Sequence, residues 1–304
     1  MIRITKPGIY KGIPIEEYHL QCCDGPSVSS SGLRTIFNES PAHFWCESSL
    51  NPEAEPPEQT GAFVLGRTAH HLLLGEDAFS TQFIARPEKL DGEAWQGNRK
   101  DCKAWLTSQE KVGRTVLLPA QIKAIRGMAK SLAAHPLVKS GILNGEIERS
   151  MFWKDKATGI WVKSRPDAIP TDSGDFADLK HTPSVKYEDL QRTIADYGYQ
   201  QQASLCGWLY KELTKRPMTS FSLVFVESKP PHCVRVVTLK DGDLARGHDQ
   251  NQMALRMMRK CLDTGAWPGP GDYSEADFIE LPSWAQARID GNLAYLKAEM
   301  ERKP

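Results

Sequence analysis

One block of the chain reads as consecutive β-strands, and it constrains the fold more than any other feature. Between residues 146 and 181, the segments EIERSMFW, GIWVKSRPDAI and DFADLKH are rich in apolar and β-branched or aromatic residues. The turn-like stretches KDKATG and TDSG separate them, so we expect neighbouring strands joined by tight turns. Two further strands are predicted over residues 220–226 and 234–239.

Helical patterns flank this block on both sides. A serine-rich cap predicts a helix from about Gly32, and Pro119 opens an amphipathic helix. Other helices are expected from Ala62, over residues 187–213, around Met253 and from about Trp284. Helices before and after a group of strands predict an α/β fold, with a central mixed β-sheet flanked by helices.

Length and composition limit the classes of protein. With 304 residues, we expect one domain: an N-terminal segment (1–60), a core (61–240) and C-terminal helices (241–304). Lys+Arg and Asp+Glu are both 38, which excludes a polybasic protein but allows a local basic patch. The seven cysteines include no CxxC pair, so reduced thiols are expected. No long apolar run or signal-like segment is present, which predicts a cytoplasmic protein.

Two acidic residues and a lysine are spaced for chemistry. Arg165-Pro166-Asp167 is followed, after ten residues, by Asp178-Leu179-Lys180. Asp178 and Lys180 point to the same face of one strand because side chains alternate. The TDSG turn brings Asp167 beside them. Two carboxylates suit Mg²⁺ or Mn²⁺, and the ammonium can orient a water or offset charge on a phosphate.

The acidic-x-Lys pattern is not specific by itself. It also occurs at Asp101–Lys103, Glu227–Lys229 and Glu301–Lys303. The copy at Asp178 differs because it lies in an apolar strand that follows a Pro-Asp strand and a tight turn. We therefore interpret the other three as solvated surface pairs.

Further motifs occur in a recognisable order around this pattern. They are GRTAH at residues 66–70, Glu148 within ERSMFW, the glutamines Gln200, Gln201 and Gln202, and the N-terminal stretches Tyr18-His19, SSSGLR (29–34) and SPAHFW (40–45). This order resembles PD-(D/E)xK nucleases of the lambda-exonuclease and RecB type. Within them it is most similar to the nuclease domain of the RecE, or exonuclease VIII, type and its phage relatives. The resemblance runs from about residue 8 to about residue 240.

The resemblance implies roles for single residues. His70, Asp167 and Asp178 would hold Mg²⁺ or Mn²⁺ together with the Leu179 carbonyl, Lys180 would position the attacking water, and Glu148 and Gln202 would assist. This chain departs from the family in having Cys206 where a tyrosine is expected after the glutamine. Tyr199 or Tyr210 could replace that tyrosine in space. Glu146 is the alternative to Glu148, and His71 reads better as a core residue than His70 does.

Several polar residues are candidates for DNA contacts. Ser31 and Arg34 would hold a terminal 5′-phosphate if the serine-rich segment opens a helix beside the site. The simpler interpretation is that Ser31 caps a helix and Arg34 faces water. Arg67, Lys163 and Arg165 fit contacts to the phosphate backbone and fit surface charges equally well.

The resemblance implies a Mg²⁺-dependent exonuclease of bacterial or phage origin. It would degrade linear double-stranded DNA from the 5′ end and leave a 3′ strand for a RecT-like annealing protein, as a ring-shaped oligomer. The alternatives are a PD-(D/E)xK endonuclease, a RecB-like single-strand nuclease and a non-catalytic protein that binds DNA ends.

Overall fold

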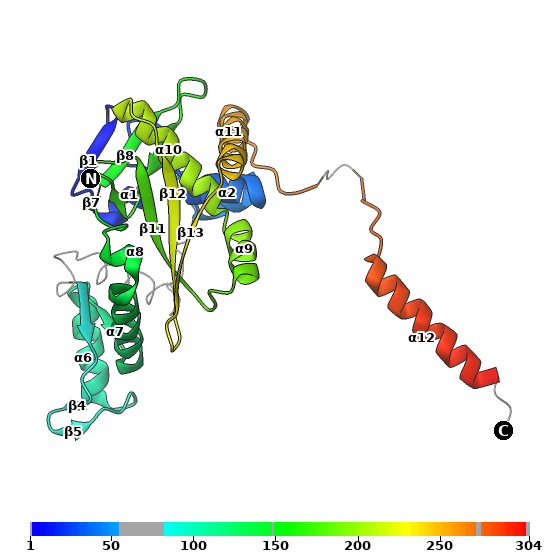
Figure 1. Ribbon diagram of the computed structural model, residues 1–304, viewed down its shortest axis with the longest axis horizontal. Helices are drawn as coiled ribbons and strands as arrows, with labels where there is room; N and C mark the ends of the chain where they lie inside the picture. The colour runs from blue at the N-terminus through cyan, green and yellow to red at the C-terminus, as the bar shows by residue number, and fades with distance from the viewer. Residues whose placement is uncertain (1, 55–81, 148, 272–274, 302–304) are drawn as a thin grey trace. The chain divides into compact units, whose positions relative to one another are not determined.

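The structure is a computed structural model that describes residues 2–54, 82–147, 149–271 and 275–301 (Figure 1). The chain divides into two compact units, Met1–Gly269 and Pro270–Pro304. The second unit holds one helix, α12 (Ser283–Glu301). The helix that follows residue 240 lies in the first unit. No helix among the described residues has the length and apolar character needed to cross a membrane.

The strands form several small sheets, so the predicted single central sheet is wrong. A four-stranded sheet has the order β1 (Gly8–Lys11), β8 (Arg149–Lys154), β9 (Trp161–Ser164), β2 (Ser27–Ser29). A three-stranded sheet has the order β11 (Asp175–Thr182), β12 (Ser220–Glu227), β13 (Val234–Thr238). Three pairs complete the described strands: β7 (Glu146–Ile147) with β10 (Ala168–Ile169), β3 (Phe83–Ala85) with β6 (Thr115–Leu117), and β4 (Lys89–Leu90) with β5 (Glu93–Ala94).

Pro166 gives a physical reason for the break between two of these sheets. A proline has no N–H to donate and is rarely tolerated within a hydrogen-bonded ladder. Strand β9 accordingly ends at Ser164, and β10 begins at Ala168 with a new partner, β7. The strand block that the sequence predicts is thus present, but it is divided at Arg165-Pro166-Asp167.

The described helices of the first unit agree with most of the predicted ones. They are α1 (Ile15–His19), α2 (Ser30–Asn38), α3 (Pro41–Glu47), α6 (Lys100–Lys111), α7 (Pro119–Ala134), α8 (Pro136–Lys139), α9 (Tyr187–Asp196), α10 (Tyr199–Thr214) and α11 (Asp241–Thr264). The helix expected over residues 187–213 is two helices, because Gly198 between them adopts a left-handed conformation (φ 59°). The helix expected from Ala62 lies outside the described residues.

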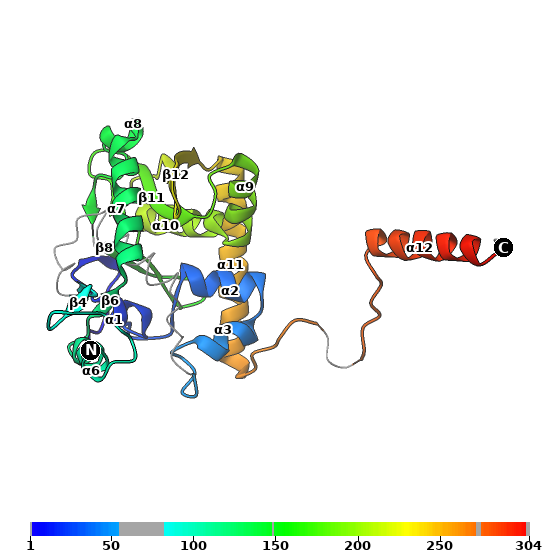
Figure 2. The ribbon, with the colours of Figure 1, turned by 90° about the horizontal axis from the view of Figure 1, so that it is seen from below.

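Helices cover both faces of β11 and its parallel neighbour β12 (Figure 2). Ala177 and Leu179 pack on one face against Ile125, Met128 and Leu132 of α7. The other face carries Phe176, which packs with Leu205 and Leu209 of α10 in the larger core cluster. Residues Asp178 and Lys180 share this second face by alternation. The fold therefore places the acidic-x-Lys pattern beneath α10.

Helix α11 fixes the position of α10 through close backbone packing. A Cβ atom at Gly247 would collide with the backbone at Gln200 and Gln201. Asn251, one turn further along, donates a 2.8 Å hydrogen bond to the Gln201 carbonyl. The glutamine-bearing end of α10 is therefore held against α11 at a site that only glycine allows.

Substituting Gly247→Ala should lower the free energy of unfolding by about 1–3 kcal/mol, since overpacking moves backbone rather than a flexible side chain. Gly242→Ala, in the same helix, is the matched control, because the nearest atom to its Cβ would be Arg246 Nη1 at 3.5 Å. This control should be neutral or stabilising by up to about 1 kcal/mol. Urea unfolding of both variants measures the difference, and equal stabilities would refute the close packing.

Candidate active site

Asp178 and Lys180 form a buried ion pair on β11. The side chain of Asp178 is 1% exposed and that of Lys180 is 18% exposed, and Lys180 Nζ contacts Asp178 Oδ2. The predicted placement of the two residues on one strand face is confirmed. A charged pair this far from water loses hydration, so it depends on its partners for stability.

Asp167 joins the pair from the segment between β9 and β10. Its Oδ2 accepts a hydrogen bond from the backbone N–H of Leu179, the residue between Asp178 and Lys180. Asp167 is half-buried. The structure thus brings together the three residues that the sequence singles out, although Asp167 arrives from the break after β9 and not from a strand of the same sheet.

Helix α10 supplies two further neighbours. Gln202 Nε2 donates a 3.1 Å hydrogen bond to Asp178 Oδ1, which orients that carboxylate. Cys206, one turn along the helix, is buried and hydrogen-bonds to Ser164. Its burial, and then the negative charges of Asp178 and Asp167, raise the pKa of the Cys206 thiol well above its ordinary value. Cys206 is therefore a neutral thiol beneath the two carboxylates.

The surroundings of Lys180 keep it protonated. Burial favours the neutral amine, but the carboxylates of Asp178 and Asp167 outweigh this effect and raise the pKa of Lys180 above its ordinary value. The ammonium also lies 4.9 Å from the centre of the Tyr199 ring, a favourable cation–π distance. Lys180 is therefore a fixed positive charge at neutral pH.

Of the two tyrosines proposed to replace the family tyrosine at Cys206, Tyr199 lies at the site. Tyr210 packs edge-on against Phe176, with ring centres 5.0 Å apart, inside the core. Tyr199 instead covers Lys180. Burial raises the pKa of its hydroxyl, while the charges of Lys180 and Arg34 oppose this rise.

The other acidic-x-Lys copies have ordinary structural roles. Asp101 pairs with Arg99 on the surface. Glu227 accepts hydrogen bonds from the backbone N–H groups of Val185 (3.3 Å) and Cys233 (3.2 Å), and Lys229 is exposed. Glu301 is exposed at the end of α12, and Lys303 lies outside the described residues. Geometry thus separates Asp178–Lys180 from the patterns that share its spacing.

The donor set fits a hard divalent cation. Magnesium is commonly held by one or two carboxylates, with waters and substrate phosphates completing its shell, and Asp167 and Asp178 are two carboxylates at one place. Among the residues that the structure describes, no group of three or more His, Cys, Asp or Glu side chains is placed to hold a metal. The predicted residues His70, Glu148 and Arg67 all fall outside the described residues.

Arg34 lies near Asp178 and does not simply face water. Its Nη1 donates a 2.7 Å hydrogen bond to the Tyr197 carbonyl. Burial lowers the pKa of its guanidinium, and the neighbouring Tyr199 and Asp178 oppose that effect. Ser31 is exposed in the first turn of α2, and the N-cap is Ser29, so the interpretation of Ser31 as the cap is wrong. Ser29 and Ser31 hydroxyls lie 2.9 Å apart.

Two other predicted DNA contacts are held by the protein itself. Lys163 is 2% exposed, and its ammonium donates to the backbone carbonyls of Tyr18 and Leu20, the latter at 2.7 Å. A direct contact between Lys163 and a DNA phosphate does not fit this placement. Arg165 is half-buried and donates a 2.8 Å hydrogen bond to the Ile13 carbonyl. Both cations tie the strand before Asp167 to the N-terminal segment.

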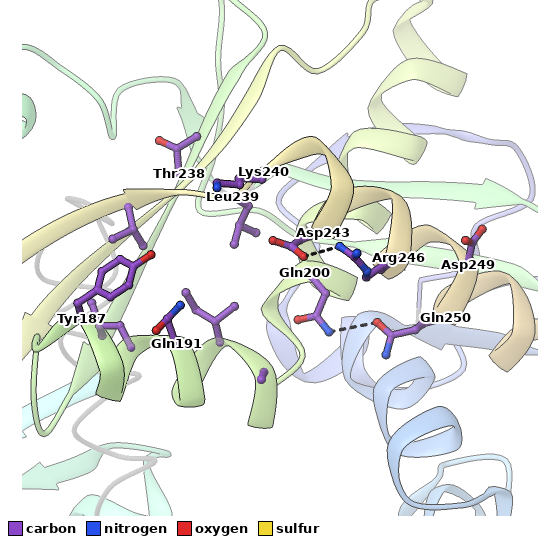
Figure 3. A pocket seen from close by; sticks show the side chains of 14 residues that line it. Tyr187, Gln191, Gln200, Thr238, Leu239, Lys240, Asp243, Arg246, Asp249 and Gln250 are labelled. Atoms are coloured by element: carbon purple, nitrogen blue, oxygen red, sulfur yellow. Dashed lines mark hydrogen bonds and ion pairs between the residues drawn. The ribbon is translucent and has the colours of Figure 1, made fainter.

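A cavity of about 690 Å³ is lined mainly by residues of α9, β13 and α11. Figure 3 shows Tyr187 and Gln191 of α9 facing Lys240 and the first turns of α11, with Gln200 hydrogen-bonded to Gln250 at 3.1 Å. None of Asp167, Asp178 and Lys180 lines this cavity. We therefore base the candidate active site on the buried charges of Asp178 and Lys180, and not on this cavity.

Comparison with known protein families identifies the family of this chain. Residues 29–278 match the family described as "PDDEXK-like domain of unknown function (DUF3799)", and the chain belongs to this family. No curated protein matches the chain.

Two solved structures are similar to it. A protein from Eubacterium rectale, described as a "Putative exonuclease", is 13% identical over 91% of this chain and 98% of its own length, with a TM-score of 0.60. A phage-related exonuclease from Haemophilus somnus is 13% identical over 79% of this chain and 96% of its own length, with a TM-score of 0.35. At these identities the first likeness is one of fold, and the second is too distant to add to it.

Sequence reasoning missed Ser164 as a neighbour of the site. Ser164 is buried at the end of β9 and hydrogen-bonds Cys206. Its position directly before Arg165-Pro166-Asp167 was the available signal, because the residue ending a strand before a Pro-Asp break must lie close to that aspartate.

Burial beneath two carboxylates should protect Cys206 from alkylation. In the folded protein at pH 8, iodoacetamide should modify the exposed Cys46 readily and leave Cys206 unmodified, because thiolate is the reactive form. Peptide mass spectrometry over time measures both sites. The unfolded protein, in which both should react, is the control, and equal rates in the folded protein would contradict this placement.

Proposed function

We propose that this protein is a metal-dependent DNA exonuclease that degrades linear double-stranded DNA from the 5′ end and leaves a 3′ strand. The observation that carries the proposal is the buried pair of Asp178 and Lys180, joined by Asp167 through the Leu179 N–H. Paired carboxylates beside a fixed ammonium suit hydrolysis of a phosphodiester, in which negative charge grows on the phosphate. Membership in a PDDEXK-like family supports this chemistry.

Asp167, Asp178 and the Leu179 carbonyl would hold Mg²⁺ or Mn²⁺. When bound, the ion would supply Lewis-acid stabilisation of the phosphodiester and lower the pKa of a water. Gln202 holds the Asp178 carboxylate in one orientation. Lys180 would keep a positive charge where the phosphate or an attacking water would lie, and the Tyr199 ring contacts that ammonium.

The proposal that the reaction starts at DNA ends rests on the order of motifs in the sequence. The description of the Eubacterium rectale protein as a "Putative exonuclease" is in line with it. Arg34 is our candidate for holding a terminal phosphate, because Asp178 is among the charges that act on its guanidinium. A ring-shaped assembly and delivery of the 3′ strand to an annealing protein are further parts of the proposal.

The rival activities make different demands on substrate. An endonuclease would cut a closed circular duplex, a single-strand nuclease would prefer unpaired DNA, and a binding protein would release no nucleotides. The complete set of Asp167, Asp178 and Lys180 favours an enzyme over a binding protein that has lost its site.

Replacing Asp178 by asparagine should reduce cleavage of linear duplex more than about a hundredfold, because the carboxylate charge is lost at the metal position. DNA-end binding should change little, since cationic contacts to phosphates supply most of the affinity. Nucleotide release and fluorescence anisotropy measure the two properties. Asp101→Asn, which alters another copy of the pattern, should leave both unchanged, and wild-type turnover by Asp178→Asn would remove the site assignment.

Replacing Lys180 by alanine should slow the chemical step by about 10²–10³-fold, since an ammonium contributes charge stabilisation. The Mg²⁺ concentration for half-maximal rate at pH 8 should stay nearly the same, because an ammonium cannot ligate the metal. Single-turnover rates across a Mg²⁺ titration separate the two effects. Lys229→Ala is the matched control from the Glu227–Lys229 copy, and a normal rate with weakened Mg²⁺ dependence in Lys180→Ala would contradict the assigned role.

A further inference from the structure

We propose that the Tyr197 ring is a stacking surface for an unpaired nucleobase of the DNA strand at the active site. The inference rests on the proposed function, and it adds that the site takes its substrate as an opened strand end and not as an intact base pair. Tyr197 was not among the DNA-binding residues predicted from the sequence.

The junction between α9 and α10 builds this surface. Tyr197 caps the C-terminal end of α9 and Tyr199 begins α10. Their rings are stacked, with centres 5.7 Å apart and planes 15° from parallel. Gly198 between them has φ 59°, and a Cβ atom there would meet the Arg34 and Gln201 side chains. The turn that aligns the two rings therefore needs glycine at its centre.

The stacked rings continue the line of groups that starts at the carboxylates. Asp178 contacts Lys180, and Lys180 Nζ lies 4.9 Å from the centre of the Tyr199 ring. Tyr199 is half-buried, whereas Tyr197 is 63% exposed. The line thus leads from the buried charges to an aromatic ring in solvent.

Arg34 anchors the backbone segment that carries this outer ring. Its guanidinium donates to the Tyr197 carbonyl at 2.7 Å, so the backbone that carries the ring is tied to α2. Arg34 and Lys180 place positive charge near the Tyr199 ring on which Tyr197 stacks. Aromatic faces next to cations match the chemistry of a nucleotide, with its flat base and its anionic phosphate.

A base can cover the Tyr197 ring only if one of its own faces is free. Stacking on aromatic side chains is tolerant of sequence and contributes about 1–3 kcal/mol per base. The terminal base of a duplex has one free face, but every base behind it has both faces covered by its neighbours. Transfer of such an inner base to Tyr197 therefore requires opening of the strand end. An enzyme acting at ends meets such bases where the duplex frays.

The test combines protein variants with DNA that lacks single bases. Dissociation constants are measured by anisotropy in the full-length Asp178→Asn protein, with duplexes carrying an abasic nucleotide at each of the first three positions from either strand end. One abasic position should weaken binding about tenfold. Adding Tyr197→Ala should weaken binding of normal DNA by a similar factor and remove the sensitivity to that abasic position, while Tyr197→Phe retains both.

Tyr187→Ala is the matched control, because Tyr187 is an exposed tyrosine at the opposite end of α9, and it should bind all duplexes like the parent protein. The proposal would be overturned if Tyr197→Ala caused no loss of binding. It would also be overturned if the loss of binding from Tyr197→Ala simply added to the loss from every abasic position. Failure of the proposed function is a separate result. It would appear as no Mg²⁺-dependent nucleotide release by the wild-type protein, whatever the binding data show.

Discussion

The ion pair between Asp178 and Lys180 is the interaction on which the candidate site depends. Both side chains lie under α10, and each needs the other because burial removes the water that would stabilise its charge. Gln202 and Tyr199 of the same helix each contact one of the two partners, Gln202 the carboxylate and Tyr199 the ammonium. The packing of α11 against Gln200 at Gly247 in turn determines where this helix lies. The site is thus a product of helix packing as much as of strand sequence.

The break at Arg165-Pro166-Asp167 is the second requirement. Because Pro166 ends the ladder of β9, Asp167 can leave the four-stranded sheet and accept the N–H of Leu179 on β11. Lys163 and Arg165 secure the strand before the break by donating to carbonyls of the N-terminal segment. Lys163 and Arg165, which were candidates for DNA contacts in the sequence, therefore help to position Asp167.

Local patterns in the sequence were sufficient for the parts that depend on local physics. Alternation in DFADLKH placed Asp178 and Lys180 on one face, and the apolar spacing after Pro119 gave the helix that covers β11. The division into several sheets could not be foreseen, because it depends on which distant strand each segment pairs with. The burial of Lys163 and the stacking of Tyr197 on Tyr199 depend likewise on contacts between distant segments and on one left-handed glycine.

The most direct test of the account is the reaction itself. A linear duplex with a label at one 5′ end, the same duplex labelled at a 3′ end, and a covalently closed circle of the same sequence are incubated with the protein in Mg²⁺ or in EDTA. We expect early release of the 5′-labelled nucleotide in Mg²⁺, late release of the 3′ label, and no reaction with the circle or in EDTA. Cleavage of the circle would contradict an end-dependent enzyme, and absence of any Mg²⁺-dependent product would contradict the assignment of Asp167, Asp178 and Lys180 as a nuclease site.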